Sequence, residues 1–259
     1  MIDIHCHILP EADDGPSSLE ASLHMARTAV QLGIRTMYAT PHHADGHFTN
    51  EADTVREAVN RFNRELSQAS IPLDVRIGQE VRLHRYLIED LLNAQVALLN
   101  NSSYFLLELP SVWTWEEWEE TFYELDLLGL IPIIAHPERN PAILRKPDLL
   151  LELIRRGALS QVTAASLTGH FGRRVHKAAL AMCEQRLTHF IASDAHLAGQ
   201  RLEELPQAFR FIGSQFGEAY ARHFQENAMA LSVSERIYPW EPVVNHRKSI
   251  FGFKKKQSL

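Results

Sequence analysis

The sequence predicts an α/β fold with parallel strands, and three observations support this prediction. Seven short apolar segments, rich in Val, Ile, Leu, Tyr and Phe, are too short for helices and are typical of buried strands. Helical patterns separate most of these segments, and alternation of strand and helix indicates a parallel sheet. Because the segments are apolar on both faces, closure into a barrel is favoured over an open sheet.

The strand segments share a length that suits a buried strand and, in nearly every case, a polar residue at the end. They are expected at residues 1–5, 35–40, 73–80, 104–109, 131–136, 159–163 and 188–193. The sequence contains no internal repeat and no low-complexity linker. One domain over residues 1–240 is therefore predicted.

The first helix is predicted between residues 17 and 33. Ser17 is the expected N-cap, because Glu20 follows at the spacing of a capping box, and Gly33 is expected to end the helix. Further helices are predicted at 51–67, 116–128, 147–156 and 170–186. Periodicity is lost from about Tyr238, so residues 241–259 are predicted to be a tail, wrapped on the surface or free of it, that carries a cationic run at 254–256.

Composition excludes several classes of protein. In a chain of 259 residues, a hydrophobic fraction of 45% is ordinary for a soluble domain with a sizeable core. A net charge of −6 argues against nonspecific nucleic-acid binding. No apolar run reaches the roughly 18 residues of a membrane span, and the N-terminus lacks a signal core, so a cytoplasmic protein is expected. Cys6 and Cys183 are too few for a disulfide framework.

Metal-binding residue types stand where the predicted strands end. In a βα barrel the carboxyl ends of the strands meet at one rim, where chemistry gathers. His5 and His7 are alternate residues of an extended strand, so both side chains point to one side and can grip one cation. The remaining candidates at that rim are His42, Glu80, Glu108, His136, Asp194 and His196, with Asp13 or Asp14 from the first loop. Only the sixth strand contributes no evident ligand.

The number and type of these side chains indicate a multinuclear centre. At about three protein ligands for each catalytic metal, nine side chains imply two or three ions. Imidazole mixed with carboxylate suits manganese, iron or zinc and disfavours calcium. Clustered ions can acidify water and clamp a phosphoryl group for in-line attack, so the pattern predicts hydrolytic metal chemistry.

The ordered motifs resemble a known family. They are Met-Ile-Asp-Ile-His-Cys-His-Ile-Leu-Pro at 1–10, Asp-Asp-Gly at 13–15, Ala-Thr-Pro-His-His at 39–43, Gly-Gln-Glu at 78–80, Ala-His-Pro-Glu-Arg-Asn at 135–140, Ser-Asp-Ala-His at 193–196 and Phe-Gly-Phe at 251–253. Together they resemble the bacterial PHP-superfamily, manganese-dependent protein-tyrosine phosphatases of capsule and exopolysaccharide gene clusters (YwqE/CpsB type). The resemblance covers essentially the whole chain.

This resemblance implies a distorted (β/α)7 barrel of the PHP type with a trinuclear Mn2+ site. By resemblance, one metal would be held by His5, His7, Glu80 and Asp194, a second by Glu80 as a bridge with Glu108 and His136, and a third by Asp14, His42 and His196. Asp14 is preferred to Asp13 on resemblance only, since the spacing does not decide between them. Arg139 and Arg201 match family arginines that contact the substrate phosphate. His43 is a candidate proton donor, and the alternative is that it is a histidine behind the metal ligands or in a loop.

The implied substrate is a tyrosine-phosphorylated protein, the tyrosine-rich tail of the bacterial autokinase that controls polysaccharide export. A cysteine mechanism is excluded, because that class needs an Arg six positions after the Cys, and Ala12 and His189 stand there. The main alternative is another PHP phosphoesterase acting on histidinol phosphate or a small phosphate ester. Two further alternatives are an amidohydrolase, disfavoured because no Lys stands at a central strand end, and a module that binds phosphotyrosine without turnover. The sequence does not determine the oligomeric state, and an oligomer is one of the possible states.

Overall fold

The computed structural model describes residues 1–243, apart from the side chains of Asn101, Glu117 and Gln200. The fold is mixed α/β with two parallel sheets. A three-stranded sheet has the order β1 (Ile2–Cys6), β2 (Thr36–Ala39) and β4 (Asp74–Ile77). A six-stranded sheet has the order β3 (His42–His43), β5 (Glu80–Arg82), β6 (Tyr104–Glu108), β7 (Ile131–Ala135), β8 (Leu159–Thr163) and β9 (Phe190–Ala192).

Strands form in all seven predicted segments, but two of the segments are wrong in detail. The second segment stops at Ala39 and resumes as β3, a strand that was not predicted, after Pro41, which has no N–H to donate to a neighbouring strand. The third is not one strand over 73–80, because Gly78 and Gln79 separate β4 from β5. A Cβ on Gly78 would lie 2.6 Å from a methyl carbon of Leu99, so this close approach requires glycine.

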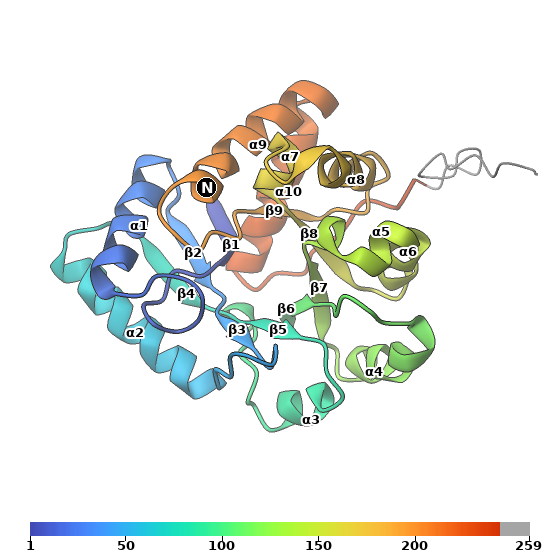
Figure 1. Ribbon diagram of the computed structural model, residues 1–259, viewed down its shortest axis with the longest axis horizontal. Coiled ribbons are helices and arrows are strands. Elements are labelled where there is room, and N and C mark those ends of the chain that lie inside the picture. Colours follow the sequence, from blue (N-terminus) through green and yellow to red (C-terminus); the bar gives the residue numbers. More distant parts are fainter. Residues whose placement is uncertain (244–259) are drawn as a thin grey trace, which may run out of the picture.

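The two sheets follow one another round the molecule. The chain passes directly from β2 to β3 and from β4 to β5, which links the sheets on one side. On the other side the segment after β9 returns to β1: the amide of Asp194 donates to the carbonyl of His5 at 2.9 Å, and the amide of His7 donates to the carbonyl of Ala195 at 2.9 Å. Figure 1 shows the strands around the middle of the molecule with helices outside them.

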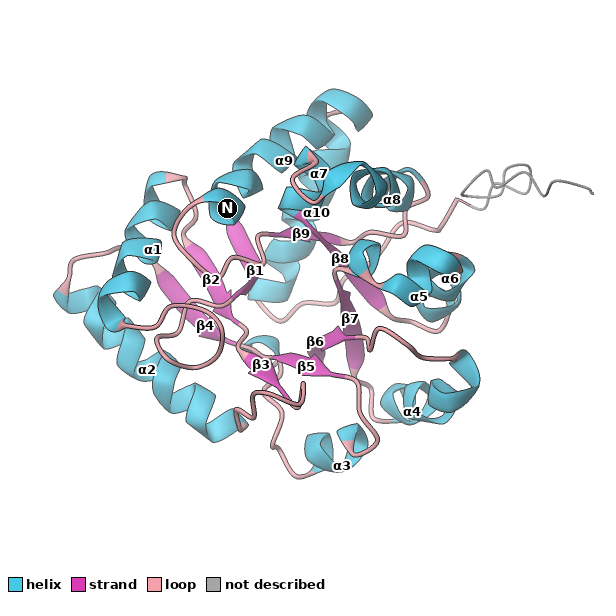
Figure 2. Cartoon of the chain, viewed as in Figure 1, coloured by secondary structure: helices cyan, strands magenta, loops and turns pink. Residues whose placement is uncertain are grey.

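The five predicted helices are present within one or two residues of their expected ends. Figure 2 shows the helices in cyan around the strands. The helices are α1 (Leu19–Gln31), α2 (Ala52–Gln68), α3 (Leu87–Leu92), α4 (Trp115–Leu127), α5 (Pro141–Arg145), α6 (Asp148–Arg155), α7 (Ala164–Thr168), α8 (Gly172–Glu184), α9 (Gln200–Phe216) and α10 (Glu218–Ser232), with 3-10 turns η1 (Leu99–Asn101) and η2 (Pro137–Arg139). The predicted cap of α1 is wrong by one residue. Ser18, not Ser17, is the N-cap, and its hydroxyl accepts a hydrogen bond from the amide of Ala21 at 3.2 Å.

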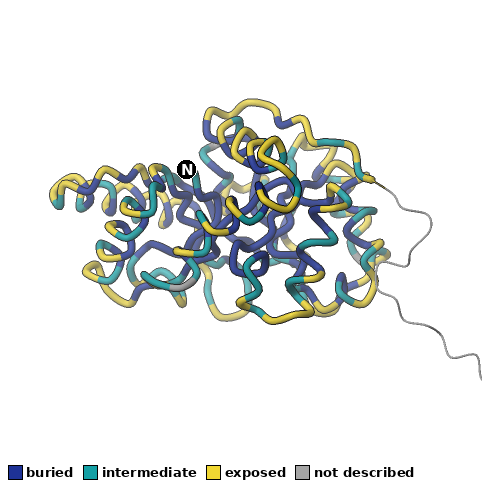
Figure 3. The backbone as a smooth tube through the Cα atoms, turned by 90° about the horizontal axis from the view of Figure 1, so that it is seen from above, coloured by how far each residue is buried: buried dark blue, intermediate teal, exposed yellow. Residues whose placement is uncertain are grey.

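Alternate strand residues face two separate hydrophobic clusters. In β6, Phe105 and Leu107 belong to the larger cluster between strands and helices, whereas Tyr104 and Leu106 belong to a smaller one. The smaller cluster also takes Ala228 and Leu231 from α10. Buried residues accordingly run through the middle of the molecule, and exposed residues follow the outer helices (Figure 3). Both strand faces are apolar for this reason, as the sequence indicated.

The segment after α10 packs on the surface. The amide of Ile237 donates to the hydroxyl of Tyr104 at 2.9 Å, and the ring of Trp240 stacks on His223 with centroids 4.0 Å apart. The amide of Val243 then donates to the carbonyl of Gln185 at 2.9 Å. Up to residue 243, this part of the chain is thus wrapped on the surface, which is one of the two expected alternatives. The cationic run at 254–256 lies outside the described residues. Within residues 1–243, no helix is both long and apolar enough to cross a membrane.

Candidate metal centre

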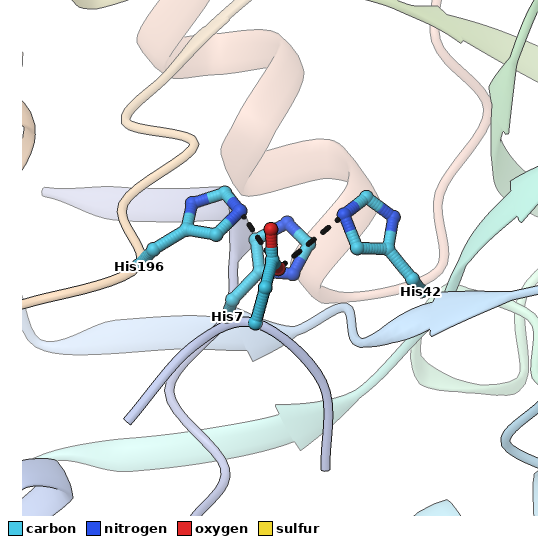
Figure 4. Close-up of side chains that lie close together, drawn as sticks. His7, His42 and His196 are labelled. Carbon is cyan, nitrogen blue, oxygen red and sulfur yellow. Dashed lines mark ion pairs between the residues drawn. The ribbon is translucent and has the colours of Figure 1, made fainter. Parts of the chain in front are cut away.

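All nine predicted ligands lie near one another, where β1, β6, β7 and β9 end and where β3 and β5 begin. They come from β1 and its following loop (His5, His7, Asp14), β3 (His42), β5 (Glu80), β6 (Glu108), the residue after β7 (His136) and the segment after β9 (Asp194, His196). Three sets of ligand atoms each gather within 4.8 Å: His5, His7 and Glu80; His42, Glu80 and Glu108; and His7, Asp14, His42 and His196. Figure 4 shows the rings of His7, His42 and His196 gathered in one place.

The first set, together with Asp194, places two imidazoles against two carboxylates. The Nε2 atom of His5 lies 3.2 Å from Oε2 of Glu80 and 3.5 Å from Oδ1 of Asp194. The Nε2 atom of His7 lies 3.4 Å and 3.6 Å from the same two oxygens. The two Nε2 atoms are 3.3 Å apart. Four potential donors therefore converge on one point, as the alternate spacing of His5 and His7 predicted.

The outer nitrogens of these histidines are held by acceptors. The Nδ1 of His5 lies 2.9 Å from Oε1 of Gln161, and the Nδ1 of His7 lies 2.6 Å from Oδ2 of Asp13. An Nδ1–H that donates to each acceptor leaves the lone pair on Nε2, which faces the carboxylates. Metal-binding histidines are oriented in this way by an outer hydrogen-bond partner.

Asp13 and Asp14 occupy different positions, although they are adjacent. Asp14 is half exposed, and its Oδ1 lies 3.5 Å from Nε2 of His42 and 3.2 Å from Nε2 of His196. Asp13 instead accepts hydrogen bonds from His7 and from the amides of Gly15 and His42. Burial raises the pKa of Asp13, but these hydrogen bonds outweigh it and hold the pKa at about 2. The geometry favours Asp14 as the ligand, with Asp13 as the group that orients His7.

The set around Glu80 differs in one respect from the grouping that the resemblance implies. The Nε2 of His136 donates to Oε1 of Glu80 at 2.7 Å, but it is His42 that gathers with Glu80 and Glu108. The Nδ1 of His42 lies 3.2 Å from Oε2 of Glu80. Glu80 thus lies between the sets, where a bridging carboxylate would be needed.

The electrostatics of the centre suit cations. Burial lowers the pKa of His5, but the carboxylates of Glu80 and Asp194 outweigh it and raise that pKa above its usual value. Burial likewise raises the pKa of Glu80, but His5 and His136 hold it well below the usual range. A place that stabilises a proton between buried carboxylates also stabilises a metal ion. Oε2 of Glu80 and Nδ1 of His42 are buried without a hydrogen-bond partner, as expected of atoms that bind an ion.

Backbone strain marks two of the predicted ligands. His136 has φ 31° and Asp194 has φ 51°, in the left-handed region that residues other than glycine rarely adopt. Such strain is typical of functional sites, where the surrounding structure holds a residue in an unfavourable conformation. Both residues follow the end of a strand, and their side chains face the other predicted ligands.

Arg139 and Arg201 both contact Asp194. Arg139 donates through Nη1 to Oδ2 of Asp194, and Arg201 donates through Nη1 to the Asp194 carbonyl at 2.9 Å. Each arginine side chain is 31% exposed. The two guanidinium groups therefore border the centre and remain accessible from outside.

Sequence reasoning missed several residues of this region. Gln161, on the sixth strand segment where no ligand was seen, orients His5. Glu138 is fully buried and accepts hydrogen bonds from the amide of Thr163 and the hydroxyl of Ser166, which ties the loop after β7 to β8 and α7. A polar residue inside an apolar strand was the available signal for Gln161.

The structure does not bring His43 to the centre. His43 follows His42 directly in β3, so its side chain points to the opposite face of the strand. His43 is buried. Burial lowers the pKa of His84, Asp90 raises it by a smaller amount, and nearby His43 lowers it further. This position does not support His43 as the proton donor to the leaving group, and it favours the alternative of a histidine outside the centre.

Comparison with known proteins shows relatives along nearly the whole chain. Residues 1–232 match a family model described as capsular polysaccharide synthesis, CpsB/CapC. The tyrosine-protein phosphatase YwqE of Bacillus subtilis is 43% identical over 98% of this chain and 100% of its own length. The tyrosine-protein phosphatase CpsB of Streptococcus agalactiae is 30% identical over 89% of this chain and 98% of its own length.

Solved structures agree with the sequence relatives. One solved structure matches with a TM-score of 0.90 at 42% identity. It is described as one of the crystal structures of YwqE from Bacillus subtilis and CpsB from Streptococcus pneumoniae, unique metal-dependent tyrosine phosphatases. The match covers 95% of this chain and 100% of the chain in that structure. A histidinol phosphate phosphatase from Lactococcus lactis matches with a TM-score of 0.52 at 12% identity, over 82% of this chain and 92% of its own. At that identity the second match shows a shared fold alone.

Proposed function

This chain belongs to the CpsB/CapC family of capsular polysaccharide synthesis proteins, and we propose that it is a metal-dependent protein-tyrosine phosphatase. The observation that carries the proposal is the convergence of oriented imidazoles and buried carboxylates beside two accessible arginines. Relatives that are named tyrosine-protein phosphatases over nearly their full length support it. A cysteine nucleophile is not required, and burial raises the pKa of Cys6 well above its ordinary value, which keeps this thiol inert.

We propose that the centre holds two or three Mn2+ ions, with iron or zinc as other metals that this donor set suits. His5, His7, Glu80 and Asp194 would hold one ion, and Glu80 would be shared with a second at Glu108. Asp14, His42 and His196 would hold a third, and His136 would orient or complete the shared site. Such ions would supply Lewis-acid stabilisation of phosphoryl charge and would acidify water at neutral pH.

The chain's own residues prepare the phosphate for attack. Arg139 and Arg201 border the centre from one side, so their free N–H groups can bind phosphoryl oxygens and offset the charge that develops there. Asp194 holds both guanidinium groups through Oδ2, while its Oδ1 faces the histidines. A tyrosinate leaving group, with a parent pKa of about 10, needs less protonation than an alkoxide would.

We interpret the two sheets as a distorted (β/α)7 barrel in one domain over residues 1–240, with 241–259 as a tail. The return of the chain from β9 to β1 and the smaller hydrophobic cluster among the strands support this interpretation. Interruptions at Pro41 and Gly78 would account for the distortion.

We further propose that the substrate is a tyrosine-phosphorylated protein in the cytoplasm, the tail of a bacterial tyrosine kinase that controls polysaccharide synthesis. The names of the relatives support the phosphotyrosine substrate and the capsule link. The test is phosphate release from a phosphotyrosine peptide, a phosphoserine peptide and histidinol phosphate, each with metal-stripped protein and with added Mn2+. Selective, Mn2+-dependent release from the phosphotyrosine peptide is expected, whereas release from histidinol phosphate alone would overturn the substrate.

A further inference from the structure

One aromatic ring contacts both arginines of the candidate centre. Phe171 is the N-cap residue of α8, at the end of the loop that follows α7. The Cζ atom of Arg139 lies 4.9 Å from the centroid of its ring, and the Cζ atom of Arg201 lies 5.3 Å from it. Both distances are within the range of a cation–π interaction. Arg139 ends η2 and Arg201 lies in the first turn of α9, so this one ring joins two separate elements.

Phe171 is not an ordinary core residue. It is half-buried, and it belongs to neither of the two hydrophobic clusters of the described chain. Its side chain makes one further ring contact, edge-on with exposed His170 at a centroid distance of 5.6 Å. Packing of the fold therefore does not account for an aromatic residue here, whereas contact with the two guanidinium groups does.

The two arginines share the carboxylate of Asp194, and Arg201 also lies 3.1 Å from Nδ1 of His196 through its Nη1. Both donate to Asp194, and they carry like charges, so each guanidinium group is drawn to the same carboxylate and repelled by its neighbour. The negative face of an aromatic ring attracts both cations without accepting their N–H groups. The ring thus restricts the direction of each guanidinium group and leaves N–H donors free for a phosphate.

We propose that Phe171 is a positioning residue for phosphate recognition, which holds Arg139 and Arg201 in the orientation that binds phosphoryl oxygens. This inference rests on the proposed function, since it concerns the same phosphate. Phe171 acts through the arginines and touches no reacting atom. Its loss should weaken phosphate binding more than it slows the chemical step.

The test compares Phe171→Leu, which keeps an apolar side chain without a ring, with Phe171→Tyr, which keeps the ring. The readouts are kcat and KM for a phosphotyrosine peptide, the inhibition constant of inorganic phosphate, and bound metal. Phe171→Leu should raise KM and the phosphate inhibition constant about tenfold, equivalent to about 1.4 kcal/mol, with kcat changed less than about threefold and metal content unchanged. Phe171→Tyr should restore both constants to within about twofold of the parent protein.

The matched control is Trp240→Leu, which removes a ring that lies 5.3 Å from the Cζ atom of Arg186, away from the centre. It should leave KM and the phosphate constant unchanged. A Phe171→Leu protein with parental phosphate affinity, or a Phe171→Tyr protein as weak as Phe171→Leu, would overturn the role of the ring. A parent protein that binds phosphate in calorimetry but releases none from any substrate would contradict the proposed function, while the same calorimetry on the variants would still decide the inference.

Discussion

Asparagine at position 13 or at position 14 should have distinct effects on metal binding, although the residues are adjacent. Asp13→Asn keeps one acceptor oxygen, but it replaces the other oxygen with an amide that clashes with one of three N–H donors, from His7, Gly15 and His42. Asp14→Asn removes a charged oxygen that lies 3.5 Å from His42 and 3.2 Å from His196. Under the proposed assignment, the first change disturbs the orientation of the ligand His7, and the second removes the negative charge of the ligand Asp14.

The expected magnitudes follow from these positions. Loss of an outer carboxylate that orients a metal-binding histidine weakens metal binding by about 10- to 100-fold, or about 1.4 to 2.7 kcal/mol. Asp13→Asn should therefore still bind every ion at a higher Mn2+ concentration. Asp14→Asn should bind one ion fewer at micromolar Mn2+, because two neutral imidazoles then lack their shared anionic partner.

The assay is calorimetric titration of metal-stripped protein with Mn2+, with turnover of a phosphotyrosine peptide measured at each Mn2+ concentration. Asp74→Asn is the control, because this carboxylate pairs with Arg76 at 2.7 Å at the start of β4, at the other end of the strand from the centre. It should bind Mn2+ like the parent protein. Full stoichiometry in Asp14→Asn together with a lost ion in Asp13→Asn would reverse the two roles and refute the reasoning.

Three further predictions concern the arginines, a buried histidine and the metal. Arg139→Ala should lower kcat/KM about 10- to 100-fold with metal content unchanged, because it removes a charged donor to phosphate; unchanged turnover would contradict its role. Burial, with a smaller effect of His223, lowers the pKa of His189 to about 3, so between pH 6.5 and that value the unfolded chain binds a proton that the folded protein excludes. This group should thus lower the free energy of unfolding by about 2 kcal/mol between pH 6.5 and pH 5. In urea unfolding at pH 7 and pH 5, His189→Gln should lose less of its free energy of unfolding than the parent protein does. Equal losses in the two proteins would exclude His189 as the cause. Chelation should lower the melting temperature, since Mn2+ at 100 times its Kd stabilises the folded state by about 2.7 kcal/mol, and a melting curve insensitive to chelator would argue against a metal bound only by the folded chain.

Local pattern was sufficient for much of the fold. The strand segments and five helices could be predicted because apolar periodicity reflects which face of each element is buried, and that signal lies within a short stretch of chain. The long helices α9 and α10 were not predicted. The same locality placed His5 and His7 on one side of β1. Polar residues that follow apolar runs could be assigned to a common rim, because parallel strands bring their carboxyl ends together. The capping residue of α1 was missed by one position, since Ser17 and Ser18 are both good caps and the choice depends on backbone angles.

The sequence by itself determined seven strand segments, five of the helices and the chemical types at the strand ends, because burial and side-chain chemistry are properties of short segments. Only the tertiary structure decided which of these groups touch. Gln161 reaches His5 across 156 positions of sequence, and Phe171 meets two arginines from different elements. Such contacts depend on the register between strands and on strained turns such as those at His136 and Asp194, which are imposed by the packing of the whole chain and leave no periodic signal in the sequence.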